Sequence, residues 1–280
     1  MNALPARVGV IGGGRMGAGI AHAFLIRGCE VVVIEPNAPG RTAEAIAASL
    51  DESLARGLEG TREQWSARLS VHESQMHLSD VDLAVEAVPE QWGLKLDTLR
   101  EAESLLPERA VLASNTSSFS ISRVASELER PERFLGLHFF NPVPASKLVE
   151  VVVGARTPKS LVDDARGWVE ALGKTAIVVK DAPGFASSRL GNALALEAIR
   201  MVEAGVASAE DIDNALVLGY GHAAGPLRTS DIVGLDVRLN IAEYLAQELG
   251  QRFTPPKLMR DMVARGELGR KTGKGFYDWS

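Results

Sequence analysis

The fold is decided by the stretch Val8-Gly9-Val10-Ile11-Gly12-Gly13-Gly14-Arg15-Met16-Gly17-Ala18-Gly19, which has the pattern of a buried strand running into a glycine turn. Residues 8–11 are apolar, and Gly12, Gly14 and Gly17 fit the spacing G-x-G-x-x-G. The first glycine permits a tight turn, the second lets a pyrophosphate approach the backbone, and the third lets a helix pack on the strand. The stretch therefore predicts the strand–turn–helix unit of a dinucleotide-binding site.

The next segments supply the remaining parts of that unit. We expect a helix over 16–27, stopped by Gly28, and a second strand over 30–34 that ends in Glu35. The helix N-terminus would offer N–H donors and positive dipole to phosphates. Glu35 can bond both ribose hydroxyls and would repel a 2′-phosphate, which favours NAD over NADP. FAD, or a turn that holds no ligand, remains an alternative. The residues expected to bind the cofactor here are Gly12, Gly14, Met16, Gly17 and Glu35.

Strands and helices alternate as far as about residue 180. Two helices broken near 57–60 are expected within 42–69. The further strands are expected over 82–88, 110–113, 134–140, 148–153 and 175–179, with helices over 94–106 and 160–172. This alternation predicts a doubly wound, mainly parallel Rossmann-type α/β sheet with an antiparallel hairpin near its end.

Beyond residue 182 the pattern is almost entirely helical. Apolar residues recur at helical spacing, and Ser208-Ala209-Glu210-Asp211 resembles a capping box. The expected helices cover 187–204, 208–219, 233–249 and 257–265. We therefore expect a dinucleotide-binding domain over 1–182, with a helical hairpin inserted at about 42–69, and an all-helical domain over 183–280. The second domain is small for a self-contained core.

A hairpin is expected near the end of the sheet. Two apolar arms, 137–140 and 148–153, flank Asn-Pro-Val-Pro at 141–144, which cannot continue a central strand because proline lacks an N–H. If the chain folds back symmetrically about residue 144, His138 and Glu150 face each other, with Cβ atoms about 5 Å apart. A carboxylate at that distance favours imidazolium and fixes one tautomer, as a general base requires. An ordinary cross-strand ion pair is the alternative.

A group of small polar residues follows another expected strand. Residues 114–118, Ser-Asn-Thr-Ser-Ser, lie where open α/β sheets bind ligands, just past a strand's carboxyl end. The alternative is a helix N-cap, with Ser120 or Ser122 starting a helix that runs to Leu128.

Composition excludes several other classes of protein. The chain has 280 residues and a net charge of −6 without a long basic tract, so we expect no nucleic-acid or anionic-membrane surface. Its single cysteine, Cys29, allows no intrachain disulfide. No apolar run approaches the roughly 20 residues that span a bilayer. We expect a soluble cytoplasmic protein, and we assign no metal ligands.

With these residues assembled, the chain resembles the L-3-hydroxyacyl-CoA dehydrogenase family, in particular its short bacterial 3-hydroxybutyryl-CoA dehydrogenases. The resemblance runs nearly end to end, in motifs that follow the family's order. These motifs are Gly-Gly-Gly-Arg-Met-Gly-Ala-Gly-Ile-Ala at 12–21, Val-Glu-Ala-Val-Pro-Glu at 85–90, Ala-Ser-Asn-Thr-Ser-Ser at 113–118, His-Phe-Phe-Asn-Pro at 138–142, Asp-Ala-Pro-Gly-Phe at 181–185, Gly-Pro-Leu at 225–227, Val-Gly-Leu-Asp at 233–236 and Lys-Thr-Gly-Lys-Gly-Phe-Tyr at 271–277.

The resemblance implies a set of catalytic residues. His138 would be the general base, Glu150 its carboxylate partner, and Ser117 the residue that holds the substrate's 3-oxygen. Asn141 would help to order the site beside His138.

The resemblance also implies contacts to cofactor and substrate. Glu90 and Lys95 would lie along the nicotinamide half of NAD, and Asn115 would also contact the cofactor. The hairpin at 42–69 would face the CoA moiety, which gives Arg56 a substrate contact. The family further suggests a homodimer formed through the helical domain.

One position departs from the family's pattern. The family usually has Asn-Arg-Leu where this chain has Ser188-Arg189-Leu190, and a serine hydroxyl is shorter than an amide. Ser188 would bind substrate through a water, or the acyl group would sit differently. The alternatives that remain are a free hydroxy acid, a hydroxyacyl group on a carrier protein, or an NAD-binding protein without catalysis.

Overall fold

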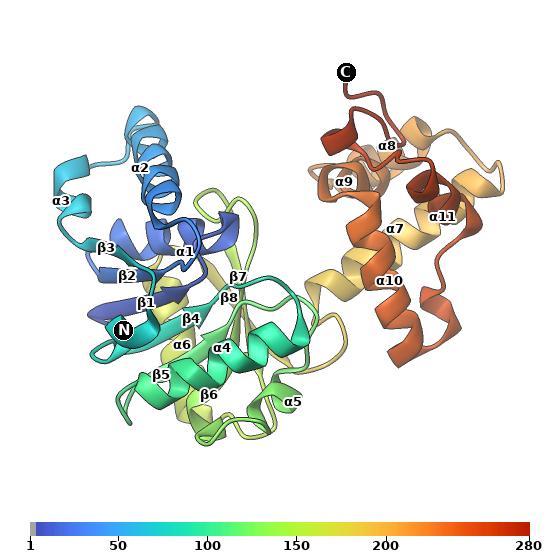
Figure 1. The fold of residues 1–280 in the computed structure, drawn as a ribbon. Helices are drawn as coiled ribbons and strands as arrows, with labels where there is room; N and C mark the ends of the chain where they lie inside the picture. Colours follow the sequence, from blue (N-terminus) through green and yellow to red (C-terminus); the bar gives the residue numbers. More distant parts are fainter. Residues whose placement is uncertain (1–3) are drawn as a thin grey trace. The chain divides into compact units, whose positions relative to one another are not determined.

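The computed structural model describes residues 4–280 and divides into two compact units, with the boundary between Asp181 and Ala182. The first unit is built on one sheet, and the second consists almost entirely of helices (Figure 1). The predicted fold class is confirmed.

The first unit contains an eight-stranded sheet with the order β3-β2-β1-β4-β5-β6-β7-β8. Neighbouring strands are parallel except β6 and β7, which form the predicted antiparallel hairpin. The strands are β1 (Arg7–Ile11), β2 (Glu30–Ile34), β3 (Leu69–His72), β4 (Leu83–Glu86), β5 (Val111–Ser114), β6 (Phe134–Phe139), β7 (Leu148–Val153) and β8 (Thr175–Lys180).

Helices cover this sheet on both faces. An apolar cluster joins α1, α2 and α6 to the strands, whereas α4 and α5 lie in front of the sheet in Figure 1. The helices are α1 (Arg15–Leu25), α2 (Pro39–Ala55), α3 (Arg62–Ser66), α4 (Trp92–Leu105), α5 (Ile121–Ala125) and α6 (Lys159–Ala171), with 3₁₀ turns η1 (Gln75–Leu78) and η2 (Pro131–Arg133). Every residue of α1 from Gly17 to Leu25 is buried, which is why this helix is apolar nearly all round.

The predicted helical hairpin is present, but its bounds differ and a strand was missed. The helices α2 and α3 cover 39–55 and 62–66, and Thr61 with Gln64 forms a capping box at the start of α3. Leu69, which we placed at the end of the hairpin, begins β3 instead. All four residues of β3 are only half-buried, because the strand lies at the edge of the sheet, so its apolar alternation is weak.

The second unit packs five helices around a core of its own. They are α7 (Ser187–Glu203), α8 (Ala209–Tyr220), α9 (Pro226–Val233), α10 (Leu235–Leu249) and α11 (Lys257–Ala264), with 3₁₀ turns η3 (Gln251–Phe253) and η4 (Arg270–Thr272). Ser208 caps α8 as expected, by accepting the N–H of Asp211. The prediction missed α9, and Val233 belongs to that helix, because Gly234 at φ +103° separates α9 from α10. The buried carboxylate of Asp231 binds the C-terminal segment by accepting the N–H groups of Phe276 and Tyr277.

Candidate active site

The β6–β7 hairpin brings His138 and Glu150 together. The two residues are directly paired in the antiparallel register, as the symmetry about residue 144 predicted. Nδ1 of His138 lies 2.6 Å from Oε2 of Glu150. His138 is 7% exposed and Glu150 is fully buried, so the carboxylate holds the ring in one orientation away from bulk water.

The turn between β6 and β7 contacts a lysine that directly precedes β8 and a glycine of α1. Lys174 donates from Nζ to the carbonyl oxygens of Val143 and Ser146, each at 2.6 Å. On α1, a Cβ at Gly19 would lie 2.8 Å from Cβ of Val143, so a larger residue would push the turn outward. Asn141 lies at the start of this turn, where its side chain is exposed.

Glu90 organises the polar loop that follows β5. Its carboxylate accepts the N–H groups of Ser117 and Ser118, both at 3.2 Å, and the hydroxyl groups of Thr116 and Ser118. Burial opposes ionisation, but the charge of Lys95 and these hydrogen bonds outweigh it, so the pKa of Glu90 lies below its usual value. An ionised Glu90 therefore fixes the backbone that carries Ser117.

A second carboxylate lies beneath this loop. Glu86, the last residue of β4, accepts from Nζ of Lys95 and from Oγ of Ser114, each at 2.5 Å. Burial raises the pKa of Glu86 above its usual value, although Lys95 acts in the opposite direction. Lys95 also pairs with Glu90 at 3.2 Å. The sequence analysis placed Ser114 in the polar segment after the strand but gave Glu86 no role, although a charged residue near the end of an apolar strand is a visible signal.

Asn115 links this loop to the strand that carries His138. Its Oδ1 accepts the N–H of Phe139 at 2.8 Å, while its own N–H donates to the carbonyl of Glu86. β5 and β6 are neighbouring parallel strands. Ser117 follows the end of β5 and His138 lies near the end of β6, so both residues are at the same edge of the sheet. Ser120 caps α5 by accepting the N–H of Arg123. The polar segment therefore both follows the carboxyl end of β5 and leads into a helix N-cap.

The glycine turn borders a cavity of about 760 Å³ that also reaches Glu35. At Gly12, with φ +105°, a Cβ would lie 2.8 Å from the Ala87 carbonyl oxygen, and at Gly17 a Cβ would collide with the Gly12 carbonyl oxygen. At Gly14 nothing lies within 4 Å of the Cβ position, which leaves room for a phosphate. Met16 also lines the cavity. These residues fit a dinucleotide.

Glu35 is preorganised at the end of β2. Its Oε2 accepts the N–H of Gly13 at 2.9 Å and its Oε1 accepts the N–H of Asn37 at 3.0 Å. The carboxylate thus faces the glycine turn, where it can meet the ribose adjoining the bound phosphates.

Besides Ser117, two residues are expected to contact the substrate, Arg56 in the first unit and Ser188 in the second. Arg56 follows the end of α2, is exposed, and pairs with Glu52 at 2.6 Å. Ser188 lies in the first turn of α7, where its carbonyl accepts from Nδ2 of Asn192 at 2.9 Å.

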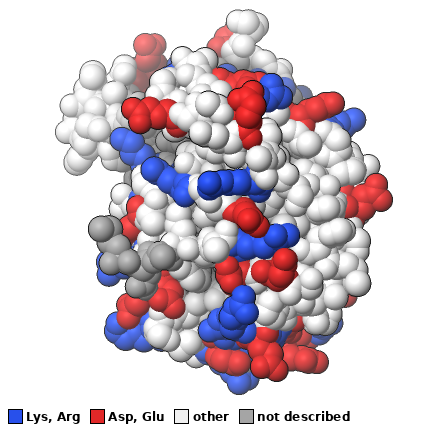
Figure 2. All heavy atoms as spheres, turned by 90° about the vertical axis from the view of Figure 1, so that its left-hand side faces the viewer, with Lys and Arg blue, Asp and Glu red and all other residues white. Residues whose placement is uncertain are grey.

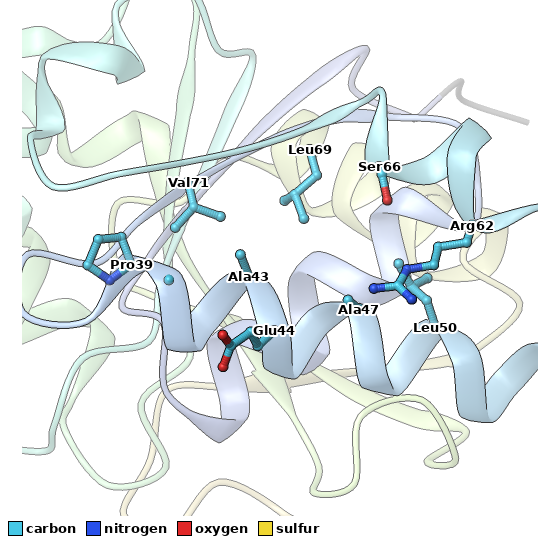
Figure 3. A pocket seen from close by; sticks show the side chains of 10 residues that line it. Pro39, Ala43, Glu44, Ala47, Leu50, Arg62, Ser66, Leu69 and Val71 are labelled. Atoms are coloured by element: carbon cyan, nitrogen blue, oxygen red, sulfur yellow. The ribbon is translucent and has the colours of Figure 1, made fainter.

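A separate hollow of about 530 Å³ lies between α2, α3 and β3 (Figure 3). In that view Leu69 and Val71 of β3 face Ala43 of α2, and Arg62 approaches from α3. Arg56 is not among its lining residues. Figure 2 shows positive and negative side chains interspersed on the side of the first unit that carries α2 and α3.

Among residues 4–280, every helix is too short or too polar to span a bilayer. The described part of the chain also contains no group of three or more His, Cys, Asp or Glu residues that could hold a metal ion.

Fold and site together define an NAD-binding oxidoreductase with a helical second unit. The NAD-binding domain model of 3-hydroxyacyl-CoA dehydrogenase matches residues 7–182, and the C-terminal domain model of that enzyme matches residues 184–279. The chain belongs to the 3-hydroxyacyl-CoA dehydrogenase family.

Relatives of known name cover nearly the whole chain. A 3-hydroxybutyryl-CoA dehydrogenase of Mycobacterium tuberculosis is 41% identical over 280 residues, covering 98% of each chain. A probable 3-hydroxybutyryl-CoA dehydrogenase of Bacillus subtilis is 39% identical over 277 residues, covering 96% of each. The solved structure of FadB2 from M. tuberculosis has a TM-score of 0.94 and 40% identity, covering 99% of this chain and all of that one.

Proposed function

We propose that this protein interconverts a (3S)-3-hydroxyacyl-CoA and the corresponding 3-ketoacyl-CoA with NAD, on a short acyl chain such as 3-hydroxybutyryl. The observation that carries the proposal is the buried pair of His138 and Glu150, with 2.6 Å between Nδ1 and Oε2. His138 lies near the end of β6 and Glu150 lies on the neighbouring strand β7, in the same sheet as β1, which runs into the glycine turn.

In the oxidising direction His138 takes the proton of the 3-hydroxyl group at Nε2, the ring nitrogen turned away from Glu150. Glu150 stabilises the imidazolium that forms, at the Nδ1 side. A positioned base of this kind contributes about 10²- to 10⁴-fold to the rate. When bound, NAD supplies the acceptor for the hydride of C3. In the reducing direction the imidazolium returns the proton to the same oxygen.

Ser117 donates a hydrogen bond to the 3-oxygen, and Glu90 sets the backbone from which it does so. Asn141 helps to order the site beside His138. Lys95 and Asn115 act on the cofactor side by fixing the loop after β5. Alignment of the reacting atoms by this loop supplies much of the remaining acceleration.

Arg56 and Ser188 are assigned to the substrate. The ion pair of Arg56 with Glu52 is exposed and contributes at most about 1 kcal/mol, so CoA phosphates can displace it. Ser188 would meet the acyl part through a water. Because a serine stands there, a free hydroxy acid or a carrier-bound acyl group stays an alternative substrate.

A panel of substrates tests the proposed activity. NADH consumption is measured with acetoacetyl-CoA, longer 3-ketoacyl-CoAs, an acetoacetyl carrier-protein thioester and free acetoacetate. We expect turnover to be fastest on acetoacetyl-CoA. If the protein prefers the carrier thioester or the free acid, that compound and not the acyl-CoA is the substrate. If none of the compounds is turned over, an NAD-binding protein without catalysis is favoured.

We also infer a cytoplasmic homodimer that forms through the helical unit. That unit exposes large apolar side chains, which a second copy of the chain would cover. They are Leu190, Leu194, Val206, Leu218, Tyr220, Ile232, Val233 and Val237. Light scattering should give a mass twice the 29.9 kDa of one chain, and Leu218→Asp should shift it toward the monomer. A wild-type protein that is monomeric at micromolar concentration would refute the dimer.

A further inference from the structure

The hydroxyl group of Ser117 takes its direction from the loop that carries it. Among residues 4–280 this hydroxyl group has no hydrogen-bond partner, so no other side chain orients it. A donor to a developing oxyanion must come within about 3 Å of that oxygen, and a misplacement of about 1 Å can cost about 10²-fold in rate. The backbone of residues 116–119 must therefore be held in place for Ser117 to act.

The polar contacts of this loop leave its tilt weakly restrained. Four hydrogen bonds from residues 116–118 converge on a single atom, Oε1 of Glu90. Bonds that meet at one atom hold the loop at that point but oppose its rotation about the point only weakly. At the far end, the hydroxyl group of Ser120 donates to Oδ2 of Asp181 at 2.7 Å. The remaining contact between these two points is the side chain of Phe119.

The ring of Phe119, two residues after Ser117, packs against Trp92. The ring centroids lie 5.3 Å apart with an interplanar angle of 79°, which is an edge-to-face arrangement. Trp92 is the first residue of α4, and both rings are half-buried. Cζ of Arg123 lies 4.3 Å from the centroid of the Trp92 ring, so a cation–π contact also holds the indole. Glu90 and Trp92, two residues apart in the chain, thus hold the loop from its polar and its apolar side.

We propose that Trp92 is a positioning residue, which fixes through Phe119 the direction of the Ser117 hydroxyl group. It acts on the backbone of the loop and not on the reacting atoms. The proposal rests on the role proposed above for Ser117 in the reaction. The restraint of the loop itself does not depend on that role and can be measured without turnover.

Amide hydrogen exchange measures this restraint on the full chain. The N–H groups of Ser117 and Ser118 donate to Glu90, so their exchange is slow while the loop is held. Trp92→Ala should raise the exchange rate of these two amides about tenfold. Trp92→Phe keeps an aromatic partner for Phe119 and should stay within about threefold of the wild type. Unchanged exchange in Trp92→Ala would overturn the proposal, whether or not the protein turns over acetoacetyl-CoA.

A double-mutant cycle on kcat links the restraint to the Ser117 hydroxyl group. With acetoacetyl-CoA, Trp92→Ala should lower kcat about tenfold in the wild-type background and less than about twofold in Ser117→Ala, where no hydroxyl group is left to misdirect. A merely structural loss would lower kcat by the same factor in both backgrounds, and that result would overturn the proposal. If the wild type is inactive, the proposed function fails, and the exchange rates alone decide whether Trp92 holds the loop.

Trp279 provides a matched control in the second unit. It is half-buried like Trp92 and has a guanidinium group over its ring, with Cζ of Arg228 at 4.9 Å from the centroid. Trp279→Ala should change kcat by the same factor with and without the Ser117 hydroxyl group, and should leave the exchange of the loop amides unchanged. A coupling to Ser117 as large as that of Trp92 would show that the contact with Phe119 is not its cause, which would overturn the proposal.

Discussion

Lys95 and Glu86 form an ion pair that is almost wholly buried. Nζ lies 2.5 Å from Oε1, and the two side chains are 1% and 0% exposed. Removal of one partner from such a pair leaves a desolvated charge, which costs far more than the intact pair contributes. We therefore expect Lys95→Met to lower the free energy of unfolding in urea by about 3 kcal/mol or more.

The matched control for this variant is Lys159→Met. Lys159 pairs with Asp163 on the surface of α6, also at 2.5 Å, but both side chains are exposed. Exposed pairs contribute about 0–1 kcal/mol, so this variant should be nearly neutral. Equal effects of the two variants would show that burial does not decide the stability of the Lys95 pair.

Ser117→Ala tests the hydroxyl assigned to the 3-oxygen. The backbone N–H of Ser117, which donates to Glu90, is kept in this variant, so the loop should keep its shape. Loss of one donor to a developing oxyanion typically costs about 10²-fold, and we expect kcat to fall by about that factor with acetoacetyl-CoA. A kcat within threefold of the wild-type value would remove Ser117 from the reaction.

Glu35→Gln tests the source of cofactor preference. The carboxylate accepts the N–H groups of Gly13 and Asn37, so the amide can keep part of this geometry without the charge. We expect the ratio of kcat/KM for NADH over NADPH to fall about tenfold, since repulsion of a 2′-phosphate is removed. The same measurement on Glu30→Gln, an exposed residue at the other end of β2, should show no change.

The buried residue His22 predicts a pH dependence of stability. Burial, with a smaller effect of the nearby Lys174 charge, lowers the pKa of His22 to about 4. The neutral ring lies between the hydroxyl groups of Ser49 and Ser53. Since the unfolded chain takes up a proton near pH 6.5 and the folded one does not, the stabilisation is complete above pH 6.5 and is lost as the pH falls toward 4.

The measurement for His22 is urea unfolding at pH 7.5 and pH 5. Between pH 7.5 and pH 5 the free energy of unfolding of the wild type should fall by about 2 kcal/mol more than that of His22→Gln. If the free energy of unfolding falls equally in the wild type and the variant, the pH dependence comes from groups other than His22.

The sequence predicted some relationships because they follow from short-range rules. The pairing of His138 with Glu150 is fixed by two prolines and the two-residue period of a strand, and the structure has that register. β3 was missed because an edge strand needs little apolar patterning, and α9 because Gly234 divides one helical pattern in two.

Other features depend on how elements meet in space. Glu86 and Lys95 are nine residues apart on a strand and a helix, and no periodicity links them. Gln75 and Glu101 meet across 26 residues, so their bond could not be expected from spacing. Such polar contacts depend on how helices and strands pack against one another, which local residue patterns do not specify.

In the proposed reaction His138 carries the proton. The most direct measurement is the kcat of His138→Ala for NADH oxidation with acetoacetyl-CoA, together with the Kd for NADH of the same variant. We expect a kcat lower by about 10²- to 10⁴-fold and a Kd within about twofold of the wild-type value. Turnover like that of the wild type would show that His138 is not the general base.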